Sequence, residues 1–155
     1  MDCTFHMSEG TFNYRVGAII LNENKVLMAK NEQNPYYYSV GGRVKLHESM
    51  EQAVLRECYE ETDVRFEIDR LGFIHENFFV EQSTGERFHE LCMFFYMKPI
   101  SDFAAIPAHF YEENSRESLD WLPVDRLKEY DLYPEFFKTE LIRPQKEPVR
   151  IVTYG

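Results

Sequence analysis

Long apolar segments, positive charge and paired cysteines are all scarce in this sequence. The longest clean apolar run, Leu91 to Met97, falls far short of the length that spans a bilayer, so no membrane segment is expected. The formal net charge of −10 disfavours nucleic acid or an anionic membrane as the main partner, because most of the surface would repel either one. The composition therefore favours a chain that acts on small molecules.

The cysteines and the N-terminal segment indicate the cellular compartment that we expect for this protein. The three cysteines, Cys3, Cys58 and Cys92, are odd in number and form no Cys-x-x-Cys pair, which favours reduced thiols and a cytoplasmic protein. Residues 1–13 contain no lysine or arginine and lack the basic start of a secretory signal. We expect residues 1–11 to be a flexible N-terminal lead-in and residues 12–155 to form one domain with a real core.

A glycine pair, Gly41-Gly42, precedes a segment rich in glutamate. Ser49 is a suitable N-cap, and the sequence after it predicts a helix from about Met50 to Thr62. Three apolar residues form one face of this helix: Met50, Ala53 and Val54. At about 100° per residue, Glu57 and Glu61 fall within the same arc and Glu60 lies at its edge.

Carboxylates on an apolar helix face need a physical reason. Burying unpaired carboxylates is costly and neighbouring negative charges raise each other's pKa, so cations must neutralise such a cluster. Oxygen ligands of this kind suit Mg²⁺ or Mn²⁺. The alternative is a solvated acidic helix, but the polar arc holds other residues: Glu51, Gln52, Leu55 and Tyr59. Arg56 precedes Glu60 by four residues and is suited to orienting that carboxylate.

The segment from Gly42 to Val64 resembles the Nudix box. The family pattern falls on nine positions: Gly42, Glu48, Arg56, Glu57, Cys58, Glu60, Glu61, Asp63 and Val64. Eight of these nine residues fit the pattern if Cys58 counts as apolar. Asp63 is the misfit, since glycine is usual there, although Asp tolerates the left-handed conformation that ends a helix. Val40 and His47 also depart from the usual residues of the preceding loop.

The resemblance implies an α+β fold, the Nudix-type α/β/α sandwich with a mixed β-sheet. Patterning predicts two hairpins, one from Phe12–Leu21 with Lys25–Lys30 and one from Leu71–Val80 with Arg87–Lys98. Further elements are expected as strands at 36–40, 65–68 and 119–122, a helical turn at 123–128, and a helix at 134–142.

The resemblance also implies roles for individual residues. Glu57, Glu60 and Glu61, with Glu48 assisting, would hold Mg²⁺ or Mn²⁺. The base that activates water would be Glu60, Glu61 or Glu90, because acidic residues outside the box serve in this family. Gly41, Gly42 and Arg43 are the candidate substrate-binding loop, and the diphosphate clamp remains open among four residues: Arg43, Arg15, Lys45 and Arg87.

Two acidic residues, a tyrosine run and a loop outside the box are further candidates. Glu90 lies on a strand that is apolar on both faces, so it needs a partner, either a metal site or solvent with Arg87; Glu76 is a weaker candidate of the same kind. One tyrosine of 36–38 is a candidate for stacking on a nucleobase, and the loop from Pro99 to Asn114 is a candidate substrate wall.

These observations predict a hydrolase of the Nudix type, a magnesium-dependent pyrophosphatase that cleaves a diphosphate linkage. Its substrate would be a small-molecule nucleoside diphosphate linked to another moiety. A homodimer is compatible with this prediction. Two alternatives remain: a non-catalytic Nudix domain that senses a nucleotide metabolite, and a diphosphate-dependent isomerase, which would need a proton donor such as Cys92.

Overall fold

The computed structural model describes residues 1–112 and 115–155. Its strands are β1 (Thr4–Met7), β2 (Gly10–Ile19), β3 (Leu21–Asn22), β4 (Lys25–Asn31), β5 (Tyr37–Arg43), β6 (Ile68–Val80), β7 (Arg87–Met97), β8 (His109–Glu112), β9 (Ser115–Pro123), β10 (Leu132–Tyr133) and β11 (Val149–Tyr154). The helices are α1 (Met50–Thr62), η1 (Phe103–Ala105), η2 (Val124–Glu129) and α2 (Phe137–Glu140). None of the helices among the described residues combines the length and apolar character needed to cross a membrane.

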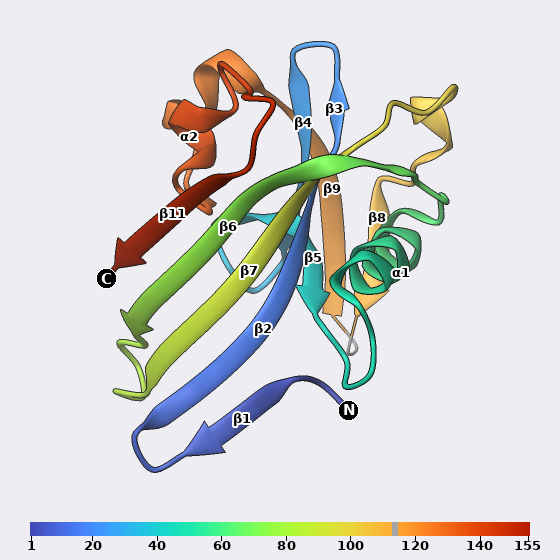
Figure 1. Ribbon diagram of the computed structural model, residues 1–155. Helices are drawn as coiled ribbons and strands as arrows, with labels where there is room; N and C mark the ends of the chain where they lie inside the picture. The colour runs from blue at the N-terminus through green and yellow to red at the C-terminus, as the bar shows by residue number, and fades with distance from the viewer. Residues whose placement is uncertain (113–114) are drawn as a thin grey trace.

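The strands form one mixed, twisted sheet (Figure 1). Its order is β11-β6-β7-β2-β5-β4-β9-β8, with β1, β3 and β10 pairing beside this path. Strand β2 is parallel to β7 and antiparallel to β5, and β11 is parallel to β6. Because side chains alternate across a strand, each strand contributes one set of residues to the face that carries α1 and another set to the opposite face.

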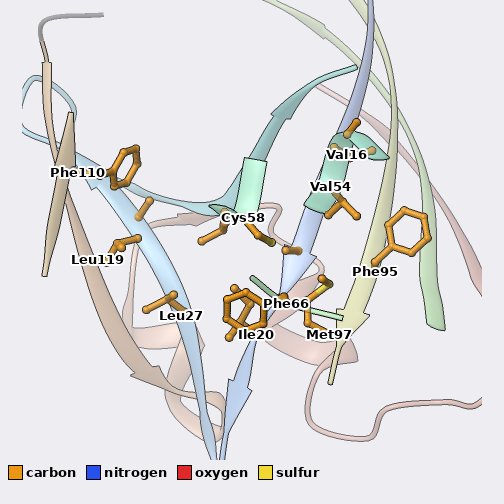
Figure 2. Close-up of a cluster of buried hydrophobic side chains, with 14 of the residues drawn as sticks. Val16, Ile20, Leu27, Val54, Cys58, Phe66, Phe95, Met97, Phe110 and Leu119 are labelled. Atoms are coloured by element: carbon orange, nitrogen blue, oxygen red, sulfur yellow. The ribbon is translucent and has the colours of Figure 1, made fainter. Parts of the chain in front are cut away.

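Helix α1 covers one face of the sheet, and an apolar core lies between them (Figures 1 and 2). Val54 and Cys58 of the helix are fully buried against Val16 of β2 and Phe95 of β7. Odd-numbered residues of β7 therefore face α1. The buried side of the helix ends in Glu57 and Glu61, which continue its apolar stripe.

The opposite face has its own core, formed with η2, α2 and the segments around them. Phe94 and Tyr96 of β7 belong to this second core, so even-numbered residues of β7 face away from α1. Phe137 of α2 is fully buried there and contacts Phe94 edge to face, with ring centroids 5.3 Å apart. A helical layer thus covers part of each face of the sheet.

Local sequence explains both ends of α1. The Ser49 side chain accepts a hydrogen bond from the Gln52 backbone N–H, and the Gln52 side chain accepts one from the Ser49 backbone N–H. This capping box satisfies two donors that the first turn otherwise leaves without partners. Asp63 ends the helix in the left-handed conformation with φ 60°, as expected for its place in the sequence.

The structure confirms the hairpin of β6 and β7 but changes several other expectations. The expected hairpin of Phe12–Leu21 with Lys25–Lys30 is present only near its turn, where Leu21 pairs with Val26 and the Leu27 N–H donates to the Ile20 carbonyl at 3.0 Å. The rest of the predicted strand is β2, which ends at Ile19 and pairs with β5 and β7 instead. Residues 65–67 are not a strand, since β6 begins at Ile68. The expected lead-in instead contains β1, which pairs antiparallel with β2.

Candidate functional site

Glu57 is buried between α1 and the glycine pair of β5. It is 7% exposed, and its Oε1 accepts a hydrogen bond from Arg56 Nη1 at 2.9 Å. Burial raises the pKa of Glu57 to about 7, although the adjacent Arg56 guanidinium acts in the opposite direction. The folded environment thus disfavours the ionised form of this carboxylate as long as no further cation is present.

Glu61 is still more enclosed, at 3% exposed. Its Oε2 accepts a hydrogen bond from the Gly41 backbone N–H at 2.8 Å. Burial, followed by the negative charge of Glu57, raises the pKa of Glu61 well above its ordinary value. Two neighbouring buried carboxylates therefore each disfavour the other's ionisation.

Arg56 organises the carboxylates on the more open side of the helix. Its Nε and Nη2 donate to the two oxygens of Glu48, at 2.7 and 2.9 Å, and the hydrogen bonds from Arg56 lower the pKa of Glu48. Arg56 Nη2 also donates to the Arg43 carbonyl at 3.0 Å. The expected Arg56–Glu60 ion pair is present at 3.3 Å, but it is only one of three such contacts.

Glu60 differs from the other two helix glutamates because it is exposed, with 52% of its side chain accessible. The sequence placed it at the edge of the apolar face, and the structure shows that the burial cost falls on Glu57 and Glu61 alone. Glu60 therefore lies at the solvent side of the group, in contact with Arg56, whereas Glu57 and Glu61 are enclosed.

The glycine pair lies inside β5 rather than in a loop after it. At Gly42 an added Cβ would overlap the Glu57 carboxylate, so only glycine lets that side chain pack there. Gly41 has φ 151°, and its Cβ would overlap the Val16 carbonyl oxygen. The two glycines thus allow the helix carboxylates to approach the backbone of β5 closely.

A second acidic group, which the sequence did not reveal, lies beside α1. Glu117 of β9 is buried, accepts a hydrogen bond from the Tyr38 hydroxyl, and accepts another from Asn31 Nδ2 at 2.8 Å. The negative charge of Glu112 in β8 adds to the raised pKa of both Glu57 and Glu61. No spacing rule connects these strands to the box; only the sheet pairing brings them together.

Glu112 also bears on the expected substrate wall. It lies in the predicted 99–114 loop, which contains η1 and β8 in the structure, and residues 113–114 lie outside the described part of the chain. This loop therefore brings an acidic strand end near α1, in addition to its aromatic residues.

Glu90 does not join the helix carboxylates. It shares the even-numbered face of β7 with Phe94, which is the face away from α1. Its Oε2 accepts a hydrogen bond from Asn13 Nδ2 at 2.8 Å. The structure thus supplies the partner that Glu90 requires on the opposite side of the sheet. Glu76 is likewise bound elsewhere, to Arg150 at 2.7 Å.

The four candidate residues for the diphosphate clamp lie in different parts of the structure. Arg15 and Arg43 are directly opposite each other on β2 and β5, next to the glycine pair. Arg43 lies 3.8 Å from Asp2, and the charge of Arg15 partly offsets the raised pKa of Glu61. Arg87 lies at the far end of β7, and Lys45 donates its backbone N–H to Glu48. Arg15 and Arg43 are therefore the two candidates beside the glycine pair, and their side chains lie on the face of the sheet away from α1.

Comparison with known proteins identifies the family. A family model described as the NUDIX domain matches residues 11–140. The chain belongs to the NUDIX family. The match includes the glycine pair, α1 and the strands from β2 to β10, so the carboxylate site lies within the Nudix domain.

Individual relatives agree with this assignment. A MutT-like protein from Streptomyces ambofaciens is 31% identical over 61 residues, which is 39% of this chain. The matched part spans 40% of the length of that relative.

Solved structures share the fold. A MutT protein from Bacillus halodurans superimposes with a TM-score of 0.66 at 16% identity, covering 92% of this chain and 91% of that one. An ADP-ribose pyrophosphatase from Streptococcus suis gives a TM-score of 0.56 at 16% identity, covering 90% and 98%. The predicted Nudix-type α/β/α sandwich with a mixed sheet is thereby confirmed.

Nudix hydrolases generally use divalent metal ions. Within residues 1–112 and 115–155, no three His, Cys, Asp or Glu side chains are already gathered as a ligand set. The donor chemistry nevertheless fits a hard divalent cation, because Glu57 and Glu61 are buried carboxylates on one side of α1 and Glu60 is an exposed carboxylate beside them. The Nudix box thus provides a group of oxygen ligands of the type that divalent metal ions prefer.

Proposed function

We propose that this chain is a Mg²⁺- or Mn²⁺-dependent pyrophosphohydrolase that cleaves the diphosphate linkage of a nucleoside diphosphate joined to another moiety. The observation that carries the proposal is the pair of buried helix carboxylates, Glu57 and Glu61. Among the described residues, Arg56 is in contact with Glu57, while Glu61 accepts its hydrogen bond from the backbone N–H of Gly41. A divalent cation supplies the charge that both lack.

The metal, when bound, polarises phosphate oxygens and neutralises charge that develops at phosphorus. Glu57, Glu60 and Glu61 would hold it, with Glu48 assisting. Arg56 fixes Glu48 through two hydrogen bonds and also contacts Glu57, so its part is to position carboxylates and not to touch substrate. Glu60 and Glu61 are the candidates for accepting the proton of the attacking water.

Arg15 and Arg43 are the candidates for the diphosphate clamp. Like charges directly opposite on neighbouring strands destabilise a sheet, and a bound anion between them removes that penalty. Both side chains project on the face away from α1, beside the glycine pair.

The remainder of the substrate would lie along the same face of β5. The Tyr37 hydroxyl donates to Asp120 at 3.1 Å and the Tyr38 hydroxyl donates to Glu117, so both phenols already have partners. Tyr36 instead packs edge to face against Tyr133, which is 48% exposed. This half-open tyrosine pair is the best candidate for a stacking surface.

The names of the structural neighbours support this substrate class, since they include an ADP-ribose pyrophosphatase and a UDP-X diphosphatase. The isomerase alternative is disfavoured because Cys92 faces away from α1, and burial raises its pKa to about 12. A thiol in that position has no access to a metal at Glu57 and Glu61.

A panel assay tests the proposal. Nucleotide sugars, dinucleoside polyphosphates, ADP-ribose and oxidised nucleoside triphosphates are incubated with the protein, with and without Mg²⁺, and phosphate-containing products are measured. We expect Mg²⁺-dependent release from at least one diphosphate-linked nucleoside. Metal-dependent binding without turnover of any panel member would instead support the sensor function.

A further inference from the structure

The outer edge of β11 is a strand edge without a partner in the described part of the chain. Figure 1 shows β11 as the outermost strand on its side of the sheet, with β6 on its other side. Edge strands are usually protected against pairing by charged side chains, lysine above all, by proline, by a bulge or by a covering segment. The six residues Val-Arg-Ile-Val-Thr-Tyr contain neither lysine nor proline, their one charged side chain, Arg150, is paired with Glu76, and they pair with β6 in continuous register.

The pairing with β6 fixes which backbone groups point outward. The Gly155 N–H donates to the Phe78 carbonyl at 2.7 Å, so residues of odd number in this strand direct their backbone groups toward β6. Arg150, Val152 and Tyr154 therefore direct theirs away from the sheet. No backbone hydrogen bond joins these three outward positions to any described segment beyond β6.

We propose that this edge pairs with the same edge of a second copy of the chain, in antiparallel register centred on Val152. In that register Val152 lies opposite Val152 of the second copy, and Arg150 lies opposite its Tyr154. The arrangement is isologous, because the same two contacts form on either side of the two-fold axis. Each guanidinium then meets an aromatic ring at the short distance of a cross-strand pair.

Both side chains are already held in place on the α1 side of the sheet. Arg150 donates to Glu76, with Nη2 2.7 Å and Nε 2.8 Å from Oε1. Tyr154 is 82% exposed and stacks on Phe78, with centroids 5.2 Å apart and rings 12° from parallel. Holding these groups before association reduces the entropy that pairing would cost.

The edge also suits self-association electrostatically. The chain carries a net charge of −10, which opposes association through most surfaces. None of the six residues of β11 is acidic, and Arg150 balances the nearby Glu76. The aromatic row behind Tyr154 continues through Phe78 to His89, with ring centroids 4.4 Å apart, and adds apolar surface beside the joined strands.

The experiment compares two substitutions at the predicted two-fold axis. Val152→Lys places two lysines opposite each other in the dimer, whereas in a single copy the lysine lies beside Glu76. Val152→Thr is the matched control, since it keeps a β-branched side chain of similar size. Sedimentation velocity over the micromolar range should show a wild-type dimer, a Val152→Thr dimer and a Val152→Lys monomer with an unchanged circular dichroism spectrum.

A cross-link tests the register itself. In a Cys3→Ser background, where the remaining cysteines are buried, Val152→Cys should form a disulfide-linked dimer under mild oxidation because this residue pairs with itself. A wild-type monomer at every concentration, which would leave the edge to a different partner, overturns the proposal. So does a dimer that Val152→Lys leaves intact, or a Val152→Cys protein that does not cross-link.

Discussion

The helix carboxylates Glu57 and Glu61 and the strand carboxylate Glu90 differ in burial and in the partners that they have. On the α1 face, Glu57 and Glu61 are buried side by side with a shortage of positive charge, and burial raises the pKa of each. On the other face, Glu90 has the Asn13 amide as a neutral hydrogen-bond partner at 2.8 Å. The first arrangement is stable with ionised carboxylates only if a cation binds, whereas the second is complete without one.

This difference separates a candidate cation site on helix α1 from a hydrogen-bonded carboxylate on strand β7. An acidic residue in a buried strand indicates that some partner is needed. Which partner it has depends on the face to which the side chain points. The largest consequences should therefore follow from changes at Glu57 and Glu61, and the smallest from a change at Glu90.

Replacing either buried helix carboxylate should have the largest effect on activity. Glu61→Gln or Glu57→Gln keeps the shape of the side chain but removes the charge that holds the metal, so turnover of the best panel substrate should fall by about 10³-fold. Glu51→Gln, an exposed position on the same helix, is the control and should keep normal turnover. Equal rates in Glu61→Gln and wild type would contradict the ligand assignment.

Gly42→Ala should have a large effect on both stability and activity. The added Cβ overlaps the Glu57 carboxylate, so that side chain or the β5 backbone must move. We expect the free energy of unfolding to drop by about 1–3 kcal/mol, measured by urea denaturation, and turnover to fall with it. At Gly155 an added Cβ meets its nearest atom at an ordinary 3.7 Å, so Gly155→Ala is the control. A fully stable, active Gly42→Ala protein would show that close packing at Glu57 is unnecessary.

The stability of the metal-free protein should decrease as pH rises. Burial raises the pKa of Glu57 from 4.5 to about 7, and that of Glu61 well above 4.5, so the folded state binds more protons than the unfolded chain. This contribution is fully present below the unfolded pKa and is lost as pH rises through the folded pKa. Between pH 4.5 and about 7, the free energy of unfolding should fall by roughly 1–3 kcal/mol from these groups.

Thermal unfolding in chelator across that pH range checks this expectation. Saturating Mg²⁺ should remove most of the decrease, because the cation favours the ionised carboxylates that high pH produces. Glu57→Gln should weaken the pH dependence even without metal. A melting temperature that rises steadily over this range in chelator would mean that the helix carboxylates are not destabilised by burial.

Glu90→Gln should have the smallest effect. The glutamine oxygen still accepts the hydrogen bond from Asn13, and the residue faces away from α1, so turnover should stay within about threefold of wild type. Measurement of kcat across a pH series is the check. A loss of several orders of magnitude would restore Glu90 as a candidate base and remove the distinction between the two faces.

The sequence predicted α1 closely because its signals are local. Ser49 and Gln52 form the cap, Asp63 ends the helix, and the 3.6-residue period places Glu57 and Glu61 with the apolar residues. The β6–β7 hairpin was predictable for the same reason. In each case the residues that determine the element are neighbours in the chain.

The features that the sequence did not predict depend on pairings between segments that are distant in the chain. Glu117 approaches Tyr38 only because β9 and β5 both pair with β4, and β11 reaches β6 from the far end of the chain. The face on which Glu90 lies follows from the parallel register of β7 with β2, whereas the sequence shows both sides of that strand as apolar. Alternation alone does not indicate which face carries the helix.

The effect of metal binding on stability is the most direct test of a cation site at Glu57 and Glu61. Wild type, Glu61→Gln and the control Glu51→Gln are titrated with Mg²⁺ at neutral pH while the melting temperature is recorded. We expect Mg²⁺ to raise the melting temperature of wild type and of Glu51→Gln, and we expect Glu61→Gln to lose most of this rise. An identical rise in Glu61→Gln, or none in wild type, would contradict a cation site at the buried carboxylates.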